Sequence, residues 1–233
     1  MERRMYRAWS PDVQAAQAYF RERNGRAAET ESAMRQAGAL RVDVFGAGGS
    51  WLIYAEIAGR TVKEPGAANG EVHGFEPAFL FPEAASVLSA WPGEAAPRLF
   101  ARMADIFHYQ RPAGREHWRR NGGTEGYGRI ARLKPDQVAS YVFYHYQYQE
   151  EKPGDGDKYG IIGLHENLLF FYAERPSTVE PAPYAGRLKT SSTPEDWGAV
   201  MRPHFIEWEQ AEESERIWLN LDRVLAARLP EEE

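Results

Sequence analysis

The sequence predicts an α+β fold made of two β-α-β-β-α-β units in tandem. Helix-like and strand-like segments follow one another in the same order in the two halves of the 233-residue chain. Short residue patterns also recur at matching places in that order, which is typical of duplicated structure. We expect the first unit over residues 1–121, with an insertion at 59–96, and the second over residues 124–230.

The first half starts with a predicted helix over residues 12–37. Ser10-Pro11-Asp12 is typical of a helix start, and Gly38 is typical of a helix end. Two strand-like runs follow, over residues 40–45 and 51–57.

A glycine-rich segment, residues 46–50, separates these two runs. It resembles half of a dinucleotide-binding fingerprint. A phosphate-binding loop must open a helix, so that free N–H groups face the anion, and here a second strand follows instead. The segment therefore predicts a hairpin loop.

The insertion at 59–96 contains repeated glycine and proline, which predicts a lid or an elaborated loop with little regular structure. Pro97 is then expected to open a helix that ends near Arg111, because apolar residues recur at helical spacing after it. Residues 119–123 are the best linker candidate.

The second half repeats this order of elements. We expect strands, helices and a closing strand over the following segments: strand 127–133, helix 135–150, hairpin strands 159–164 and 168–174, a helix that starts at Thr193-Pro194 and is kinked at Pro203, and strand 217–225.

Three residue patterns support the repeat. Tyr54-Ala55-Glu56 is answered by Tyr172-Ala173-Glu174, and Pro11-Asp12 by Pro135-Asp136; Pro97-x-x-Phe100 is answered by Pro194-x-x-Trp197. Two such ferredoxin-like units in tandem can pair their open sheets, so we expect an intrachain α/β barrel.

Composition excludes several classes of protein. The absence of cysteine excludes thiolate metal sites, iron–sulfur clusters, disulfides and a thiol nucleophile. No signal-like start and no long uncharged apolar run is present, so we expect a cytoplasmic protein without a membrane partner. A net charge of −6 and an acidic C-terminal tail make nucleic acid an unfavourable partner.

One helix stripe carries the candidate chemistry. Val138, Tyr141, His145 and Tyr148 fall on one face of the helix predicted at 135–150. An imidazole between two phenols can act as a general acid or base. The alternative is a core histidine bonded to a backbone carbonyl. The other five histidines lack the spacing of a metal site, so we expect neither metal nor cofactor.

From Tyr141-x-x-x-His145 onward, residues 127–230 resemble the L-rhamnose mutarotase family of dimeric α/β barrels. Tyr159, Asn167-Leu168-Leu169-Phe170, Trp197 with Met201, and Arg228-Leu229-Pro230 are similar to that family in order. The resemblance implies interconversion of monosaccharide anomers without a cofactor. His145 would then be the acid–base catalyst, Tyr141 and Tyr159 would bind sugar hydroxyls, and Trp197 would stack on the sugar ring.

Two departures limit the resemblance. Gly198 stands where the family tends to have a second tryptophan, and the interval from His145 to Tyr159 is shorter than in the family. In the first half, Arg23 or Arg21 stands in place of His145. Since arginine cannot exchange protons near neutral pH, only the second unit is expected to hold a catalytic site.

The same fold also hosts aromatic polyketide cyclases and cofactor-free monooxygenases, and fold alone cannot choose between them. A further alternative is a non-catalytic small-molecule-binding or stress-associated protein. The expected partner is therefore a small molecule, either a monosaccharide or an aromatic ring system, and a homodimer stays open.

Overall fold

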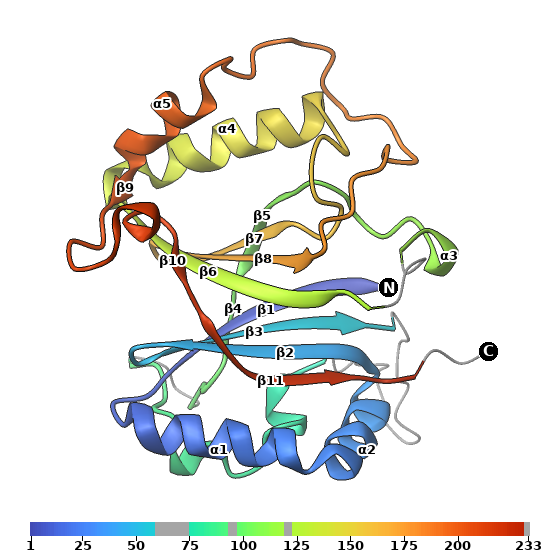
Figure 1. The fold of residues 1–233 in the computed structure, drawn as a ribbon, viewed down its shortest axis with the longest axis vertical. Coiled ribbons are helices and arrows are strands. Elements are labelled where there is room, and N and C mark those ends of the chain that lie inside the picture. The colour runs from blue at the N-terminus through green and yellow to red at the C-terminus, as the bar shows by residue number, and fades with distance from the viewer. Residues whose placement is uncertain (59–74, 93–96, 119–122, 231–233) are drawn as a thin grey trace. The chain divides into compact units, whose positions relative to one another are not determined.

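The computed structural model describes residues 1–58, 75–92, 97–118 and 123–230 (Figure 1). The chain forms two compact units, Met1–Arg102 with Arg223–Glu233, and Met103–Asp222. Within the described residues, no helix combines the length and apolar character needed to cross a bilayer.

The first unit contains a five-stranded sheet with the order β11-β2-β3-β1-β4. Its strands are β1 (Glu2–Trp9), β2 (Ala39–Ala47), β3 (Ser50–Ile57), β4 (Ala101–Arg102) and β11 (Asp222–Arg228). Without β11, and taken from the other edge, the order is β4-β1-β3-β2: the fourth strand, then the first, the third and the second. The pairings between these four strands are antiparallel. This is the ferredoxin-like arrangement that the sequence predicts.

Two helices, α1 (Val13–Gly25) and α2 (Ala27–Ala37), replace the single helix predicted at 12–37. The start is as predicted, because the Asp12 side chain accepts a hydrogen bond from the Ala15 N–H at 2.9 Å. Gly38 closes α2 in the left-handed conformation, with φ of 69°. The hairpin prediction for residues 46–50 is also confirmed, since Ala47 pairs with Ser50.

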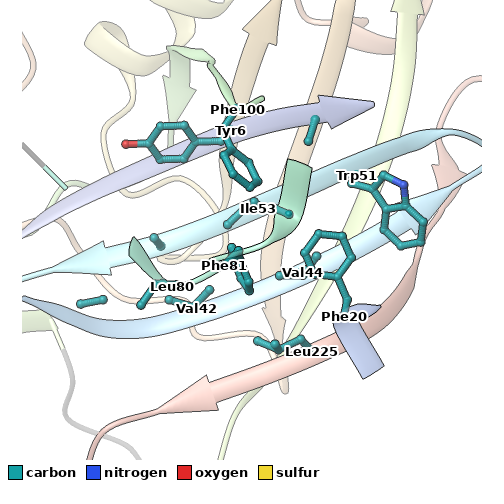
Figure 2. Close-up of a cluster of buried hydrophobic side chains, with 14 of the residues drawn as sticks. Tyr6, Phe20, Val42, Val44, Trp51, Ile53, Leu80, Phe81, Phe100 and Leu225 are labelled. Atoms are coloured by element: carbon teal, nitrogen blue, oxygen red, sulfur yellow. The ribbon is translucent and has the colours of Figure 1, made fainter. Parts of the chain in front are cut away.

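Part of the predicted insertion packs into the core of the first unit, where Leu80 and Phe81 lie among side chains of the helices and the sheet (Figure 2). Two short 3₁₀ helices, η1 (Pro77–Phe79) and η2 (Ala84–Ser86), fold this segment back on the core. Phe81 packs edge-on against Phe20, with ring centroids 5.3 Å apart. Residues 75–88 therefore act as an elaborated loop that fills the core; the rest of the insertion, 59–74 and 93–96, lies outside the described residues.

The helix predicted after Pro97 is wrong: this segment forms β4 and β5 (Ala104–His108). Met103 and Phe107 are four residues apart, a spacing that fits one face of a strand as well as one face of a helix. Pairing with β1 and β7 decides in favour of the strand. The repeat between Pro97-x-x-Phe100 and Pro194-x-x-Trp197 consequently has no structural counterpart.

The second unit has the sheet order β10-β6-β8-β7-β5. The strands in this order are β6 (Glu125–Leu133), β7 (Ile161–His165), β8 (Leu168–Arg175), β10 (Leu219–Asn220) and β5, and a short sixth strand, β9 (Phe205–Ile206), also pairs with β6. The order fourth, first, third, second recurs, and the extra strand β5 lies beside the second strand, as β11 does in the first unit. The α+β fold of two ferredoxin-like units is thus confirmed; their closure into one barrel stays a prediction.

The predicted closing strand 217–225 is divided between the two sheets. Leu219–Asn220 pairs with β6 in the second sheet, whereas Asp222–Arg228 joins β2 in the first. Val224 and Leu225 are buried in the core of the first unit, which explains why the chain leaves the second sheet at this point.

Helices α4 (Val138–Glu151) and α5 (Trp197–Met201) cover one face of the second sheet (Figure 1). The helix predicted from Thr193 is shorter than expected: α5 starts at Trp197, and the side chain of the preceding residue, Asp196, accepts from the Ala199 N–H. A 3₁₀ turn that contains Pro203 ends it, and Phe205–Ile206 forms β9. Pro203 therefore terminates the helix and does not kink it.

The Tyr-Ala-Glu repeat occupies equivalent strands. In β3 the Tyr54 hydroxyl donates to Glu56 Oε1 at 2.8 Å, and in β8 the Tyr172 hydroxyl donates to Glu174 Oε1 at 3.0 Å. Each bond joins buried side chains two positions apart on one strand face. This shared buried bond supports the duplication independently of element order.

Candidate functional site

A pocket of about 480 Å³ lies within the second unit, between its sheet and helices α4 and α5. Three of the four predicted site residues line it: Tyr141, His145 and Trp197. The remaining lining side chains are mainly aromatic or apolar: Phe107, Tyr109, Tyr148, Ile162, Phe171, Met201, Phe205, Ile217 and Trp218. The volume falls in the usual range for small-molecule sites.

His145 is held by its own helix. Its Nδ1 lies 2.9 Å from the Tyr141 backbone carbonyl oxygen, and the residue is only 4% exposed. A carbonyl can only accept, so Nδ1 carries the proton and Nε2 has a free lone pair. No hydrogen-bond partner for Nε2 occurs among the residues the structure describes, and the ring lines the pocket. The ring is therefore bonded to a backbone carbonyl, as expected for the alternative of a core histidine. Its Nε2 still remains as an acceptor for a ligand.

Burial sets the charge of this imidazole. Removal from water disfavours the cation and lowers the pKa of His145 from 6.5 to about 4, a shift that the carbonyl bond opposes and His204 slightly increases. At neutral pH the side chain is consequently neutral and presents a base at Nε2.

Tyr141 supplies the second buried polar group. Its ring lies against that of His145, with centroids 3.9 Å apart. Burial raises the pKa of Tyr141 well above 10, so its hydroxyl stays protonated and can donate to a ligand. Within the described part of the chain, this hydroxyl has no hydrogen-bond partner.

Aromatic rings enclose the imidazole. Phe107 and Trp197 meet it edge-on, with centroid distances of 5.2 and 4.9 Å. Tyr148 lies against both, 5.7 Å from Phe107 and 5.1 Å from Trp197, while its hydroxyl is bonded to Asp155. These walls favour a flat apolar ligand.

Tyr159 does not lie in this pocket. Its hydroxyl donates to the Trp118 carbonyl at 2.9 Å, and its ring packs edge-on against the Trp118 indole. The tyrosine is 1% exposed, which fits a role in packing.

Sequence reasoning missed the residues that β5 and the segment at 213–218 bring to the pocket. Phe107 and Tyr109 were assigned to a helix of the first unit, so their contact with α4 could not be foreseen. Arg129 lies on β6, and its alternation with Tyr127 and Ala131 was the one available signal that it shares their sheet face.

No cluster of metal-ligating side chains is found among the described residues.

Comparisons with known proteins give weak likenesses. No family model matches the chain, and no curated protein matches it. Among solved structures, a candidate monooxygenase from Lactobacillus acidophilus is 8% identical with a TM-score of 0.43, and the match covers 98% of this chain and 97% of that one. One from Fusobacterium nucleatum is 9% identical with a TM-score of 0.44, covering 97% and 93%.

An anthrone oxidase-like protein is 10% identical with a TM-score of 0.37, covering 97% of this chain and 92% of that one. Likenesses of this size identify no function.

Proposed function

We propose that the pocket binds a flat hydroxylated aromatic compound and that His145 removes a proton from it, as the first step of an oxidation by dioxygen. The observation that carries this proposal is a neutral imidazole with a free Nε2 inside an aromatic enclosure. Because the burial that keeps the imidazole neutral also lowers its basicity, the proton transfer depends on stabilisation of the resulting anion, to which the Tyr141 hydroxyl can donate.

The balance of polar and apolar lining supports an aromatic ligand over a sugar. Six lining residues are buried, and only Tyr141 and His145 among them are polar; the others are Phe107, Ile162, Met201 and Phe205. The charged lining residues, Arg129, Arg202, Glu213 and Arg216, lie in the part of the pocket that is at least partly exposed. Each hydroxyl of a monosaccharide that is buried without a partner costs about 1–3 kcal/mol. An aromatic ring needs few such partners and gains from contact with Phe107 and Trp197.

The chemistry balances for an anthrone, in which a methylene group lies between two rings opposite a carbonyl. His145 Nε2 takes one methylene proton and leaves a delocalised anion, and the Tyr141 hydroxyl is available to donate to its oxygen. The anion reduces dioxygen and forms a carbon–oxygen bond, and the imidazolium returns the proton to the resulting peroxide. Loss of water then leaves a quinone, so one oxygen atom enters the product and the other leaves as water.

The test measures oxygen uptake and quinone formation with a hydroxylated anthrone. We expect His145→Gln to lower kcat/KM about 100-fold or more, in line with the usual contribution of a general base. The control is His108→Gln, because His108 is bonded to Asp105 and does not line the pocket. An oxidation rate in His145→Gln equal to that of the wild type would refute the role of His145.

A sugar mutarotase is the second candidate, favoured by the meeting of Tyr141, His145 and Trp197 in one pocket. Under this proposal His145 would transfer protons at the ring oxygen and anomeric hydroxyl of a monosaccharide. Saturation-transfer NMR on a free sugar would decide: anomer exchange that requires His145, without oxygen uptake from anthrones, would replace the first proposal by the second. Ligand binding without either reaction would instead indicate a non-catalytic binding protein.

A further inference from the structure

Three arginines line the pocket, and they differ in whether a carboxylate lies close enough to neutralise the charge of the guanidinium. Arg202 lies 3.1 Å from a Glu207 carboxylate oxygen, and Arg216 lies 3.1 Å from one of Glu213. For Arg129, no carboxylate within ion-pair distance is found in the described parts of the chain. Its charge therefore faces the pocket without a direct counter-ion.

A neighbouring amide fixes the orientation of Arg129. Its Nε–H donates to Asn220 Oδ1 at 3.1 Å, across the pairing of β6 with β10. Asn220 Nδ2 in turn donates to a carboxylate oxygen of Glu215. The guanidinium is thus held by an amide at one edge, and its two Nη groups remain for a ligand.

Aromatic side chains lie next to Arg129. Its guanidinium lies 5.6 Å from the centroid of Tyr127, and Tyr127 lies 6.0 Å from Phe171, which lines the pocket. A ligand whose anionic group binds Arg129 could therefore pack its remaining atoms against these aromatic rings.

We propose that the natural ligand is an aromatic carboxylic acid whose carboxylate pairs with the two Nη groups of Arg129. Since Asn220 uses Nε, the Nη pair is the remaining fork of donors, and its planar geometry matches the two oxygens of a carboxylate. This inference rests on the proposed function, because it assumes that an aromatic body fills the pocket beside His145. Asn220 acts as a positioning residue.

The test compares two ligands of similar shape, anthracene-9-carboxylate and the neutral anthracene-9-methanol, with binding measured by quenching of tryptophan fluorescence. We expect Arg129→Met to weaken binding of the carboxylate roughly 10- to 100-fold, which is the usual effect of losing charge-assisted hydrogen bonds. Binding of the alcohol should change by less than about twofold, because its body contacts the same rings.

The matched control is Arg175→Met. Arg175 also lies over Tyr127, at 4.3 Å from the ring centroid, but is exposed and does not line the pocket, so its loss removes the same charge elsewhere. Carboxylate binding in this control should stay within about twofold of the wild type. Equal weakening in both variants would contradict the proposal by showing only a general effect of charge.

The result also separates this inference from the proposed function. If both ligands bind equally well and Arg129→Met changes neither, the carboxylate proposal fails while oxidation by way of His145 can still hold. If neither ligand binds, both proposals fail. Loss of selectivity for the carboxylate in Arg129→Met and its partial return in Arg129→Lys would support the carboxylate site.

Discussion

His145 combines a fixed tautomer with a free acceptor atom. The Tyr141 carbonyl fixes the proton on Nδ1, and burial keeps the ring neutral. The sequence predicted which face of α4 carries Tyr141 and His145, since that follows from helical periodicity. It could not predict the free Nε2, which depends on the positions of Phe107 and Trp197 in the folded unit.

The pH dependence of the reaction should reflect this imidazole. With a pKa of about 4, His145 is a base throughout the neutral range, so kcat/KM should stay level from about pH 8 to pH 5 where substrate ionisation permits. It should then fall as the ring is protonated near pH 4. A kcat/KM profile that falls with a pKa near 6.5 would show that the ring is not desolvated.

Folding stability should depend on the same group. The pKa of His145 is lower in the folded protein than in the unfolded chain, so the unfolded chain binds the proton first as the pH falls. The stability it contributes is present above pH 6.5 and is lost between about pH 6.5 and 4, by about 3 kcal/mol in total. The free energy of unfolding, measured with urea between pH 6.5 and 4, should fall more steeply with decreasing pH in the wild type than in His145→Gln. An equal fall in both proteins would contradict this prediction.

The C-terminal end of α4 anchors a long irregular segment. Glu151 accepts hydrogen bonds from the Ser192 and Thr193 N–H groups at 2.9 and 2.8 Å, and from the Thr190 hydroxyl. Gly186 lies so close to the Glu150 carbonyl that a Cβ atom there would collide with it. The segment before α5 is therefore fixed to α4 by a carboxylate and by a glycine.

Glu151→Ala should release this segment. We expect faster hydrogen exchange at the Ser192 and Thr193 amides, because both lose their acceptor, with little change in the strands of the second sheet. The exposed Glu209 provides the control as Glu209→Ala. Unchanged exchange at both amides would show that Glu151 does not hold the segment.

Tyr109 is positioned in the pocket by two glycines of the turn before β7. A Cβ atom at Gly160 would lie 2.6 Å from Tyr109 Cδ2, and Gly156 contacts the same ring. Gly160→Ala should displace this ring and weaken binding of an anthracene ligand about tenfold, which fluorescence quenching measures. Gly25→Ala, where the added atom meets nothing within 4 Å, is the control. Normal affinity in Gly160→Ala would mean that Tyr109 does not shape the site.

Strands and helices were predictable to different degrees. The hairpin of β2 and β3 follows from two β-branched and aromatic runs around a glycine turn. The segment at 104–108 was mistaken for a helix because its i, i+4 apolar spacing serves either structure, and only its distant partner β7 decides. The contribution of Phe107 and Tyr109 to the site was missed for the same reason.

Each sheet contains one strand from outside the residue range predicted for its unit. The first sheet contains Asp222–Arg228 from the end of the chain, and the second contains Ala104–His108, which precedes its own first strand. The predicted division into residues 1–121 and 124–230 would leave each fragment without one strand of its sheet. Nothing local assigns either strand to its sheet: the start of β11 fell within the predicted strand 217–225, and β5 fell within the helix predicted after Pro97.

We therefore expect the fragments 1–121 and 124–230 to be poorly folded alone and to gain structure on mixing, because each supplies the strand that the other lacks. Circular dichroism and gel filtration of separate and mixed fragments measure this. Two fragments that each unfold cooperatively in isolation would show that the exchanged strands are dispensable.

The most direct test of the account is the protonation state of His145, measured by ¹⁵N NMR with and without a hydroxylated anthrone. We predict a neutral ring with the proton on Nδ1 from about pH 5 to 8, and a change in the Nε2 resonance when the ligand binds. A proton on Nε2, titration near pH 6.5, or an Nε2 resonance that saturating ligand leaves unchanged would contradict it.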